Sequence, residues 1–340
     1  MNRLHIIRAG LCSTVQDLGR MGNQHLGVPV GGAMDRMSHE LANLLIGNAA
    51  SAATIEMTLT GDEIEFIEDS LIAVTGADMA PVLCQADTEP RSIPQHCPVK
   101  IPSGARVRFQ AAQRGCRSYL AIAGGVDVPL LMGSRATDLR SAFGGHHGRM
   151  LRAGDQLAVG ALSEFTPGIF DQLSISGQAP RSRWFVRPVD LPSLGCTSLR
   201  IVQGTHTSLL KLSQRERLSE IVFRVSAQSD RMGYRLSDHR LILQRHPEIF
   251  SAGAGPGTIQ LPPDGNPILL MADCAPTGGY PRIGHVISAD LPIAAQLRPG
   301  QLIRFEMVPL ERAQELFLQQ RQNLAKALAM AKLMPPQAIT

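Results

Sequence analysis

The chain has 340 residues, of which 44% are hydrophobic and 18% are charged, and its formal net charge is +4. This length favours two domains over one, and the composition excludes a disordered or fibrous protein. The positive charge is spread along the whole chain and aromatic residues make up only 4%, so the sequence disfavours a nucleic-acid-binding protein.

Short apolar or alternating runs follow one another along the chain and predict strands. The first are residues 3–10, 53–59, 63–68 and 71–76, and the last are 257–262, 267–272 and 301–308. The 32 glycines and 23 prolines interrupt these runs at close intervals. Such punctuation favours antiparallel sheets closed into barrels over alternating parallel strands and helices. The predicted fold class is mainly β.

Three helices are predicted among the strands. Apolar residues after Asp35 fall on one face at helical spacing, and Gly47 ends this first helix. A second helix is predicted over residues 205–217. A third is predicted over residues 310–333, before two prolines at 335–336. We expect this last helix to be an appendage to the β domains.

Four short patterns occur twice, in the same order along the chain. D-R-M-x-x-x-L at 35–41 returns at 230–236, and T-I-[EQ]-x-x-x-x-G at 54–61 returns at 258–265. D-[VL]-P occurs at 127–129 and 290–292, and L-R-x-G at 151–154 and 297–300. The echoes predict a duplicated unit. With a boundary in the stretch 163–180, the predicted domains are a first barrel over 1–165, a second over 180–309, and a helix and tail over 310–340.

Several site types and locations are disfavoured by the sequence. No run approaches the roughly 18 apolar residues of a membrane span, and the first residues lack the apolar core of a signal peptide, so we expect a cytoplasmic protein. The six cysteines are scattered without a C-x-x-C pair. His146 and His147 have no third ligand at a recognisable spacing, so we expect no metal site.

Common catalytic signatures are also missing, including the P-loop, the G-x-S-x-G elbow and H-E-x-x-H. What remains are segments dense in Gly, Arg, Asp and Tyr, at 14–20, 27–35, 144–149, 229–236, 258–268 and 273–284. Glycine brings backbone N–H groups close to a ligand and arginine pairs with anions, so such segments suit a small acid or amide. Turn geometry and structural Arg–Asp pairs are the alternative interpretation of any one segment.

Six longer motifs together resemble one family. They are T-V-Q-D-x-G-R at 14–20, G-A-M-D at 32–35, Y-L-A-x-A-G-G at 119–125, G-S-R-A-T-D at 133–138, R-M-G-Y-R-L at 231–236 and T-G-G-Y-P-R-I-G at 277–284. From about Leu4 to Val308 the chain resembles the family described as the C subunit of the bacterial ATP-dependent 5-oxoprolinase, as allophanate hydrolase subunit 2, or as the biotin-dependent carboxyltransferase domain of urea carboxylase.

The resemblance implies two tandem cyclophilin-like β-barrels, in agreement with the internal echoes. It implies a smaller partner of related fold, the B subunit, and in 5-oxoprolinase a third, unrelated partner. The leading function is ATP-dependent opening of the 5-oxoproline lactam to glutamate, with ATP used by the complex. One alternative is a carboxyltransferase component for urea or a related amide, with biotin on a separate carrier. Another is a regulatory antagonist that binds a kinase-inhibiting partner without chemistry.

Both substrate classes are resonance-stabilised amides, so the site should stabilise negative charge on a carbonyl oxygen. We expect anion and oxyanion partners, groups that orient an amide N–H, and a clamping turn. The expected catalytic residues are Arg231, Tyr234, Arg235, Gln260 and Asp273, and the expected substrate-binding residues are Thr277, Gly278, Gly279, Tyr280, Arg20, Asp35 and Arg149.

No general base is evident, and Asp35 and Glu56 stay open for that role. A structural role is the alternative for the arginines. In particular, Arg231 could pair with Asp230 or Asp273 and hold the second barrel together.

Overall fold

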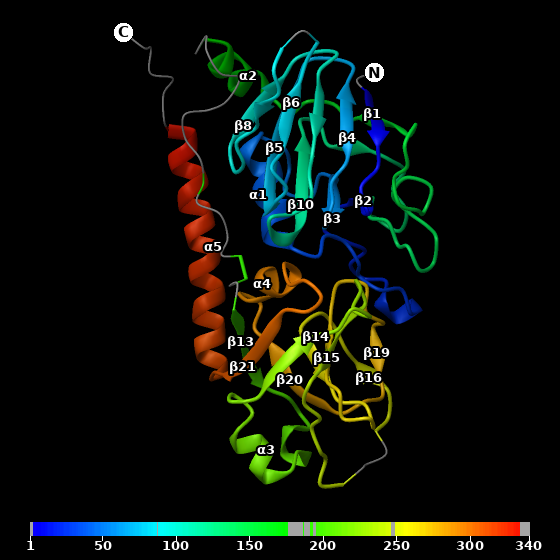
Figure 1. Cartoon of the computed structure of the whole chain (residues 1–340), viewed down its shortest axis with the longest axis vertical. Helices are drawn as coiled ribbons and strands as arrows, with labels where there is room; N and C mark the ends of the chain where they lie inside the picture. Colours follow the sequence, from blue (N-terminus) through cyan, green and yellow to red (C-terminus); the bar gives the residue numbers. More distant parts are fainter. Residues whose placement is uncertain are drawn as a thin grey trace. The chain divides into compact units, whose positions relative to one another are not determined.

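The computed structural model describes residues 3–86, 88–175, 186, 191–192, 195–245 and 249–333. The chain forms two compact units, shown in Figure 1. Unit 1 comprises 1–19, 35–190 and 323–340, and unit 2 comprises 20–34 and 191–322. Residues 20–34 therefore group with the second half of the chain, although the sequence placed them in the first barrel. The domain limits 1–165, 180–309 and 310–340 stay a prediction.

Unit 1 contains two antiparallel sheets, a seven-stranded one in the order β11-β12-β1-β4-β9-β6-β7 and a five-stranded one in the order β2-β3-β10-β5-β8. Its strands are β1 Arg3–Arg8, β2 Cys12–Gln16, β3 Thr54–Thr58, β4 Glu63–Phe66, β5 Ser70–Asp78, β6 Val82–Cys84, β7 Arg91–Ser92, β8 Pro98–Ile101, β9 Arg106–Arg108, β10 Arg114–Ile122, β11 Val126–Asp127 and β12 Gln156–Val159. Its helices are α1 Arg36–Leu45 and α2 Thr166–Ile175.

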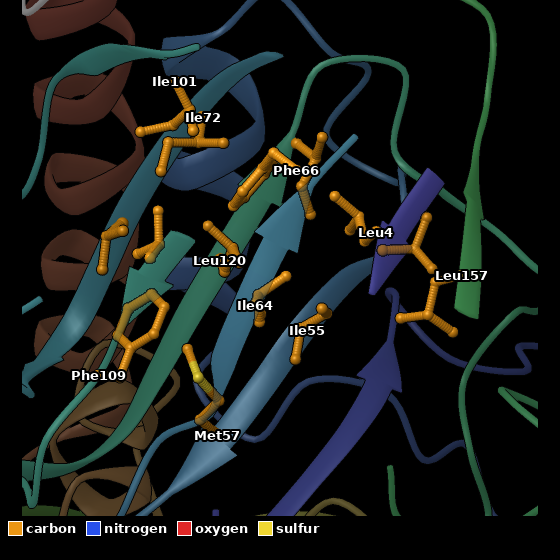
Figure 2. Packing of buried hydrophobic residues seen from close by; sticks show 14 of the residues in the cluster. Leu4, Ile55, Met57, Ile64, Phe66, Ile72, Ile101, Phe109, Leu120 and Leu157 are labelled. Carbon is orange, nitrogen blue, oxygen red and sulfur yellow. The ribbon is translucent and has the colours of Figure 1, made fainter. Parts of the chain in front are cut away.

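The core of unit 1 forms because side chains alternate between the two faces of each strand. Leu4, Ile64 and Phe66 from the seven-stranded sheet and Ile55 and Leu120 from the five-stranded sheet are fully buried in one cluster. Figure 2 shows these side chains packed together. The hydrophobic faces of the two sheets thus supply a single core.

The opposite face of the five-stranded sheet is polar and is buried under α1, which packs on β5 and β10. His39 of α1 lies with Nδ1 2.9 Å from Thr54 Oγ1, and Thr75 Oγ1 donates to the carbonyl of Ser38 at 2.7 Å. Buried polar groups need such partners, since an unpaired one costs about 1–3 kcal/mol. The hydrogen bonds therefore fix α1 on this sheet.

Unit 2 is a closed barrel with the strand order β13-β20-β17-β18-β15-β14-β21, closed by the parallel pair β13 and β21. Its strands are β13 Cys196–Gln203, β14 Val222–Val225, β15 Gly233–Ser237, β17 Thr258–Gln260, β18 Ile268–Leu270, β20 Arg282–Val286 and β21 Leu302–Met307, with a separate two-stranded ribbon of β16 Ala252–Gly253 and β19 Thr277–Gly278. Its helices are η1 Gln24–Leu26, η2 Thr207–Leu209, α3 Leu212–Glu216, α4 Leu291–Ala295 and the start of α5 Leu310–Leu333.

Residues Arg20–Met34 form an arm that packs on the barrel of unit 2. The N–H of Gly31 donates to the carbonyl of Ala272 at 3.1 Å, and the side chain of Met34 is buried in the barrel's core cluster. Gly31 and Gly32 both have positive φ, of 63° and 82°. Glycine adopts this conformation without a steric penalty, so the pair lets the arm turn against the barrel.

The mainly β class is confirmed, as are the helices predicted after Asp35 and over 310–333. The single helix predicted over 205–217 is wrong, because it is split into η2 and α3. Leu210, between them, is extended and forms a β-bridge with Leu243. The sequence also missed α2, which lies in the stretch taken as a boundary. The prolines at 335–336, predicted to end the last helix, lie outside the described residues.

Candidate functional site

An ion pair between Arg231 and Asp273 lies where the arm meets the barrel in unit 2. Arg231 donates from Nε to Asp273 Oδ2 at 2.7 Å and from Nη2 to Asp273 Oδ1 at 2.9 Å. Nη2 also donates to the carbonyl of Gly32 at 2.5 Å. Arg231 is 9% exposed, so these groups are held largely away from water. The expected pairing of Arg231 with Asp273 is therefore present, and it also fixes the arm.

Gly31 lies next to this pair and next to a second guanidinium group, that of Arg20. A methyl group at Gly31 would lie 3.5 Å from Asp273 Oδ1 and 3.8 Å from Arg20 Nη1, so both groups border this glycine. Arg20 is 1% exposed, and its N–H donates to the carbonyl of Val30 at 2.7 Å. Arg20, an expected substrate-binding residue, lies within the predicted first barrel over 1–165, but it belongs to unit 2, as Arg231 does.

Gln260 and the Thr277–Tyr280 turn form a second group of expected residues in unit 2. Gln260 is buried on β17, and a methyl group at Gly278 would overlap its Nε2 atom. Gly278 therefore leaves the space that the Gln260 amide occupies. Thr277 and Tyr280 are exposed at the end of the ribbon, and Tyr280 is 45% exposed.

The cluster of Arg20, Arg231 and Asp273 can stabilise negative charge. The guanidinium groups of Arg20 and Arg231 are buried, and a low-dielectric setting strengthens their field. A carbonyl oxygen that gains negative charge when an amide reacts is the kind of group that fixed guanidinium donors stabilise. The cluster, Gln260 and the Thr277–Tyr280 turn are together called the unit 2 site below.

Two expected residues on β15 lie elsewhere. Tyr234 is 2% exposed and belongs to the core cluster of the barrel, whereas Arg235 is exposed. Neighbouring residues on a strand point to opposite faces, so the two side chains cannot serve one site together. Their catalytic role stays a prediction, and we leave them out of the unit 2 site.

Asp35 lies in unit 1 as the N-cap of α1. Its carboxylate accepts from the N–H of Ser38 at 3.0 Å and from Ser38 Oγ at 2.6 Å. Its own N–H donates to the Tyr119 hydroxyl at 2.7 Å, and that hydroxyl donates to Glu56 Oε2 at 2.8 Å. Asp35 and Glu56 are each 1% exposed. Both carboxylates thus have structural partners within unit 1.

Arg149 also forms an ion pair within unit 1. It donates to both carboxylate oxygens of Asp155, at 2.7 and 2.8 Å, and His146 Nε2 lies 3.5 Å from the same group. The hydrogen bonds from Arg149 hold the pKa of Asp155 well below its usual range. The structure therefore gives Arg149 a partner other than substrate.

Gly31 and Gly32 were not expected as site residues, although they stand in a glycine-rich segment. Their contribution depends on contacts with residues about 200 positions later, and only the adjacent pair of glycines marks it in the sequence. Among the described residues, no group of three or more His, Cys, Asp or Glu side chains could hold a metal ion. No helix in the described part of the chain combines the length and apolar character of a membrane span.

The chain is similar to known protein sequences over most of its length. The carboxyltransferase domain family, subdomains A and B, matches residues 26–307. The chain is 37% identical to the 5-oxoprolinase C subunit of Escherichia coli strain K12 over 310 residues, which cover 91% of this chain and 93% of that protein. It is 31% identical to urea amidolyase of Saccharomyces cerevisiae over 353 residues, which cover 97% of this chain but only 18% of that protein.

Solved structures show the same relationship. The crystal structure of Kluyveromyces lactis urea carboxylase matches 96% of this chain with a TM-score of 0.81 and 28% sequence identity, and the match covers 29% of that chain. The whole fold described above, including both units, therefore corresponds to one segment of a much longer protein.

Proposed function

Because the chain belongs to the carboxyltransferase domain family, subdomains A and B, we propose that it is the C subunit of a 5-oxoprolinase. The observation that carries this proposal is the match to the 5-oxoprolinase C subunit of Escherichia coli, which spans 91% of this chain and 93% of that protein. The match to urea amidolyase spans only 18% of that protein, so most of the larger protein has no counterpart here.

In the proposed reaction, the lactam of 5-oxoproline is opened to glutamate by a complex that also hydrolyses ATP. Two partners are proposed, a smaller cyclophilin-like B subunit and a third subunit of the complex, which has an unrelated fold. This sequence has no P-loop, so we assign ATP use to the complex and derive no step through it.

The unit 2 site would serve this reaction by binding the lactam amide. We propose that Arg20 and Arg231 stabilise negative charge on the lactam oxygen, and that Asp273 holds Arg231 in position. The Gln260 side chain would accept or donate a hydrogen bond at the lactam N–H or carbonyl. The Thr277–Tyr280 turn would close one side of the substrate.

Carboxyl transfer is the second candidate function. The family description and the structural match to urea carboxylase favour it. In that case biotin is carried by a separate protein, and the same charged cluster would stabilise the developing charge on biotin or on a urea-like amide.

Reconstitution distinguishes these functions. The chain is purified with and without the two proposed partners, and ATP hydrolysis and glutamate formation are measured with 5-oxoproline. Turnover only with the full set supports the proposal. Transfer of the carboxyl group from carboxybiotin to urea, without 5-oxoproline turnover, would support the second function. Stable binding to a kinase-inhibiting partner with neither activity would indicate a regulatory antagonist.

A further inference from the structure

Unit 2 contains a pocket, which borders the Thr277–Tyr280 turn of the unit 2 site through Ile249. Its volume is about 460 Å³, within the range of roughly 300–1,000 Å³ that small-molecule sites occupy. Thr205 and His206 line it, followed by Arg245, Ile249 and Phe250, and by Arg282 of β20. None of these residues is among the individually expected site residues, although Arg282 lies in the segment 273–284, and none belongs to the Arg20, Arg231 and Asp273 cluster. We call it the Arg245–Arg282 pocket.

The charged residues among the described lining of this pocket are both arginines. Arg245 and Arg282 both line it, and none of the described lining residues is acidic. Arg282 donates from Nη1 to the carbonyl of Gly253 at 2.9 Å, which orients its guanidinium group. Arg245 makes no hydrogen bond or ion pair with any residue that the structure describes. A guanidinium has five N–H donors, so both arginines retain donors for an anion.

His206 adds a neutral donor. Its Nδ1 accepts a hydrogen bond from the N–H of Arg282 at 3.1 Å, and Thr205 Oγ1 lies 3.1 Å from the same atom. With Nδ1 an acceptor, the neutral ring carries its proton on Nε2. Burial and the charge of Arg282 lower the pKa of His206, which favours this neutral form.

The remaining wall is apolar. Ile249 is half-buried beside Phe250, whose side chain is 92% exposed and is the most exposed of the large hydrophobic residues described. An aromatic ring left in water is unfavourable, and covering it with a flat apolar group would recover that free energy. Inorganic phosphate alone would leave this surface exposed, so the wall favours an organic ligand.

We propose that the Arg245–Arg282 pocket binds an organic anion, with a carboxylate or phosphate group on the two arginines and an apolar body against Ile249 and Phe250. Carboxylate and phosphate both match the guanidinium fork, so their shared chemistry defines the ligand class. This proposal uses residues of unit 2 alone and does not depend on the proposed function.

The test is calorimetric titration of the full-length chain with benzoate and with phenyl phosphate. Saturable binding of either probe is expected, and the tighter probe identifies the preferred anionic group. Arg245→Gln should lower the affinity for the tighter probe at least tenfold. Phe250→Ala should lower the affinity for benzoate more than the affinity for acetate, because acetate has no ring to contact Phe250.

Two controls check that binding depends on the pocket and on the charge of the probe. Arg215→Gln removes another exposed arginine of unit 2 that does not line the pocket, and it should leave binding unchanged. Benzyl alcohol, which has the ring without the charge, should not bind measurably. The proposal would be overturned if neither anionic probe showed saturable binding. It would also be overturned if Arg245→Gln and Arg215→Gln lost equal affinity for the tighter probe, or if benzyl alcohol bound as tightly as that probe. Unchanged circular dichroism verifies that each variant is folded.

Discussion

Arg231 has two tasks at the residue scale, since it pairs with Asp273 and also holds the carbonyl of Gly32. A buried ion pair adds little net stability, but removing one partner leaves an uncompensated charge and costs about 3–5 kcal/mol. An alanine variant would therefore lower stability whether or not Arg231 contacts substrate. A lysine variant keeps the charge and loses the planar fork.

We predict that Arg231→Lys lowers the turnover of the reconstituted complex at least tenfold, while the chain stays folded at the assay temperature with a lower melting temperature. The lost fork removes charge-assisted hydrogen bonds of about 1.5–3 kcal/mol each, and a reacting oxygen depends on their direction. Steady-state kinetics and a thermal melt on the same sample check this. Arg215→Lys, at an exposed residue of α3, is the control and should retain activity. Equal fractional losses of activity and folded protein would favour a purely structural role.

His39 is one of the residues that contribute to the response of unit 1 to acid, together with His96, whose pKa burial also lowers to about 4. Burial lowers the pKa of His39 to about 4 from an ordinary value near 6.5. The unfolded chain therefore binds a proton at His39 at a pH where the folded chain does not. The stability that His39 contributes in its neutral form is complete above pH 6.5 and is lost as the pH falls toward 4.

We predict that His39→Asn removes part of the pH dependence of the free energy of unfolding, on the order of 3 kcal/mol across this window. Asparagine retains a hydrogen-bonding group near Thr54 but does not titrate. Urea unfolding at several pH values between 7.5 and 4.5 measures the difference. His25→Asn, at an exposed residue of the arm, is the matched control variant. Parallel curves for wild type and His39→Asn would contradict the prediction.

At the scale of elements, the packing of the β16–β19 ribbon on β17 depends on Gly278. A methyl group there would overlap Gln260 Nε2, which is the end of a flexible side chain. We predict that Gly278→Ala lowers turnover several-fold by displacing the Gln260 amide, while stability changes by less than about 1 kcal/mol because the side chain can move. Kinetics and urea unfolding measure the two effects.

A double variant tests the stated cause of this loss. If the methyl group acts through the amide, Gly278→Ala should have little further effect on turnover once Gln260→Ala is present. Additive losses would indicate that the ribbon itself is disturbed. Gly253→Ala, on the paired strand with open space around its Cβ position, is the matched control.

Local signals made some elements predictable. The helix after Asp35 was predictable because a capping aspartate, an apolar face and a terminal glycine all agree. The helix over 205–217 failed because Leu210 is fully buried and its bridge to Leu243 fixes an extended conformation. That is a tertiary contact, and propensity cannot anticipate it. The helix α2 was missed although Pro167 stands in its first turn, where proline is favoured.

The repeated sequence patterns differ in whether their two copies fall on the same kind of element. The T-I-[EQ] pattern falls on β3 and on β17, and Ile55 and Ile259 are each buried in their own unit's core. The D-R-M pattern falls on a helix start in one copy and before a strand in the other. The candidate site was likewise only partly predictable from the sequence. The Arg231 and Asp273 motifs were visible in the sequence, but the convergence of Arg20 and Gly31 on them is a long-range result of folding.

At the scale of the whole molecule, the chain alternates between its two units. It leaves unit 1 after Gly19, adds the arm Arg20–Met34 to unit 2, and returns to unit 1 at Asp35. Met34 and Met37 are therefore three residues apart, and yet Met34 is 5% exposed in the core of the barrel, while Met37 is 6% exposed on α1. Residues that are close neighbours in the sequence therefore stabilise different units.

We predict that Met34→Ala and Met37→Ala destabilise different units. Each removes a buried side chain, which costs about 2–5 kcal/mol for methionine in a packed core. Hydrogen exchange by mass spectrometry on the full chain should show faster exchange in β13–β21 for Met34→Ala, and in α1 and the strands it covers for Met37→Ala. Each variant is the control for the other. The same regions accelerating in both variants would mean that the two units open as one, because a local loss of packing speeds exchange only within the cooperative unit that contains it.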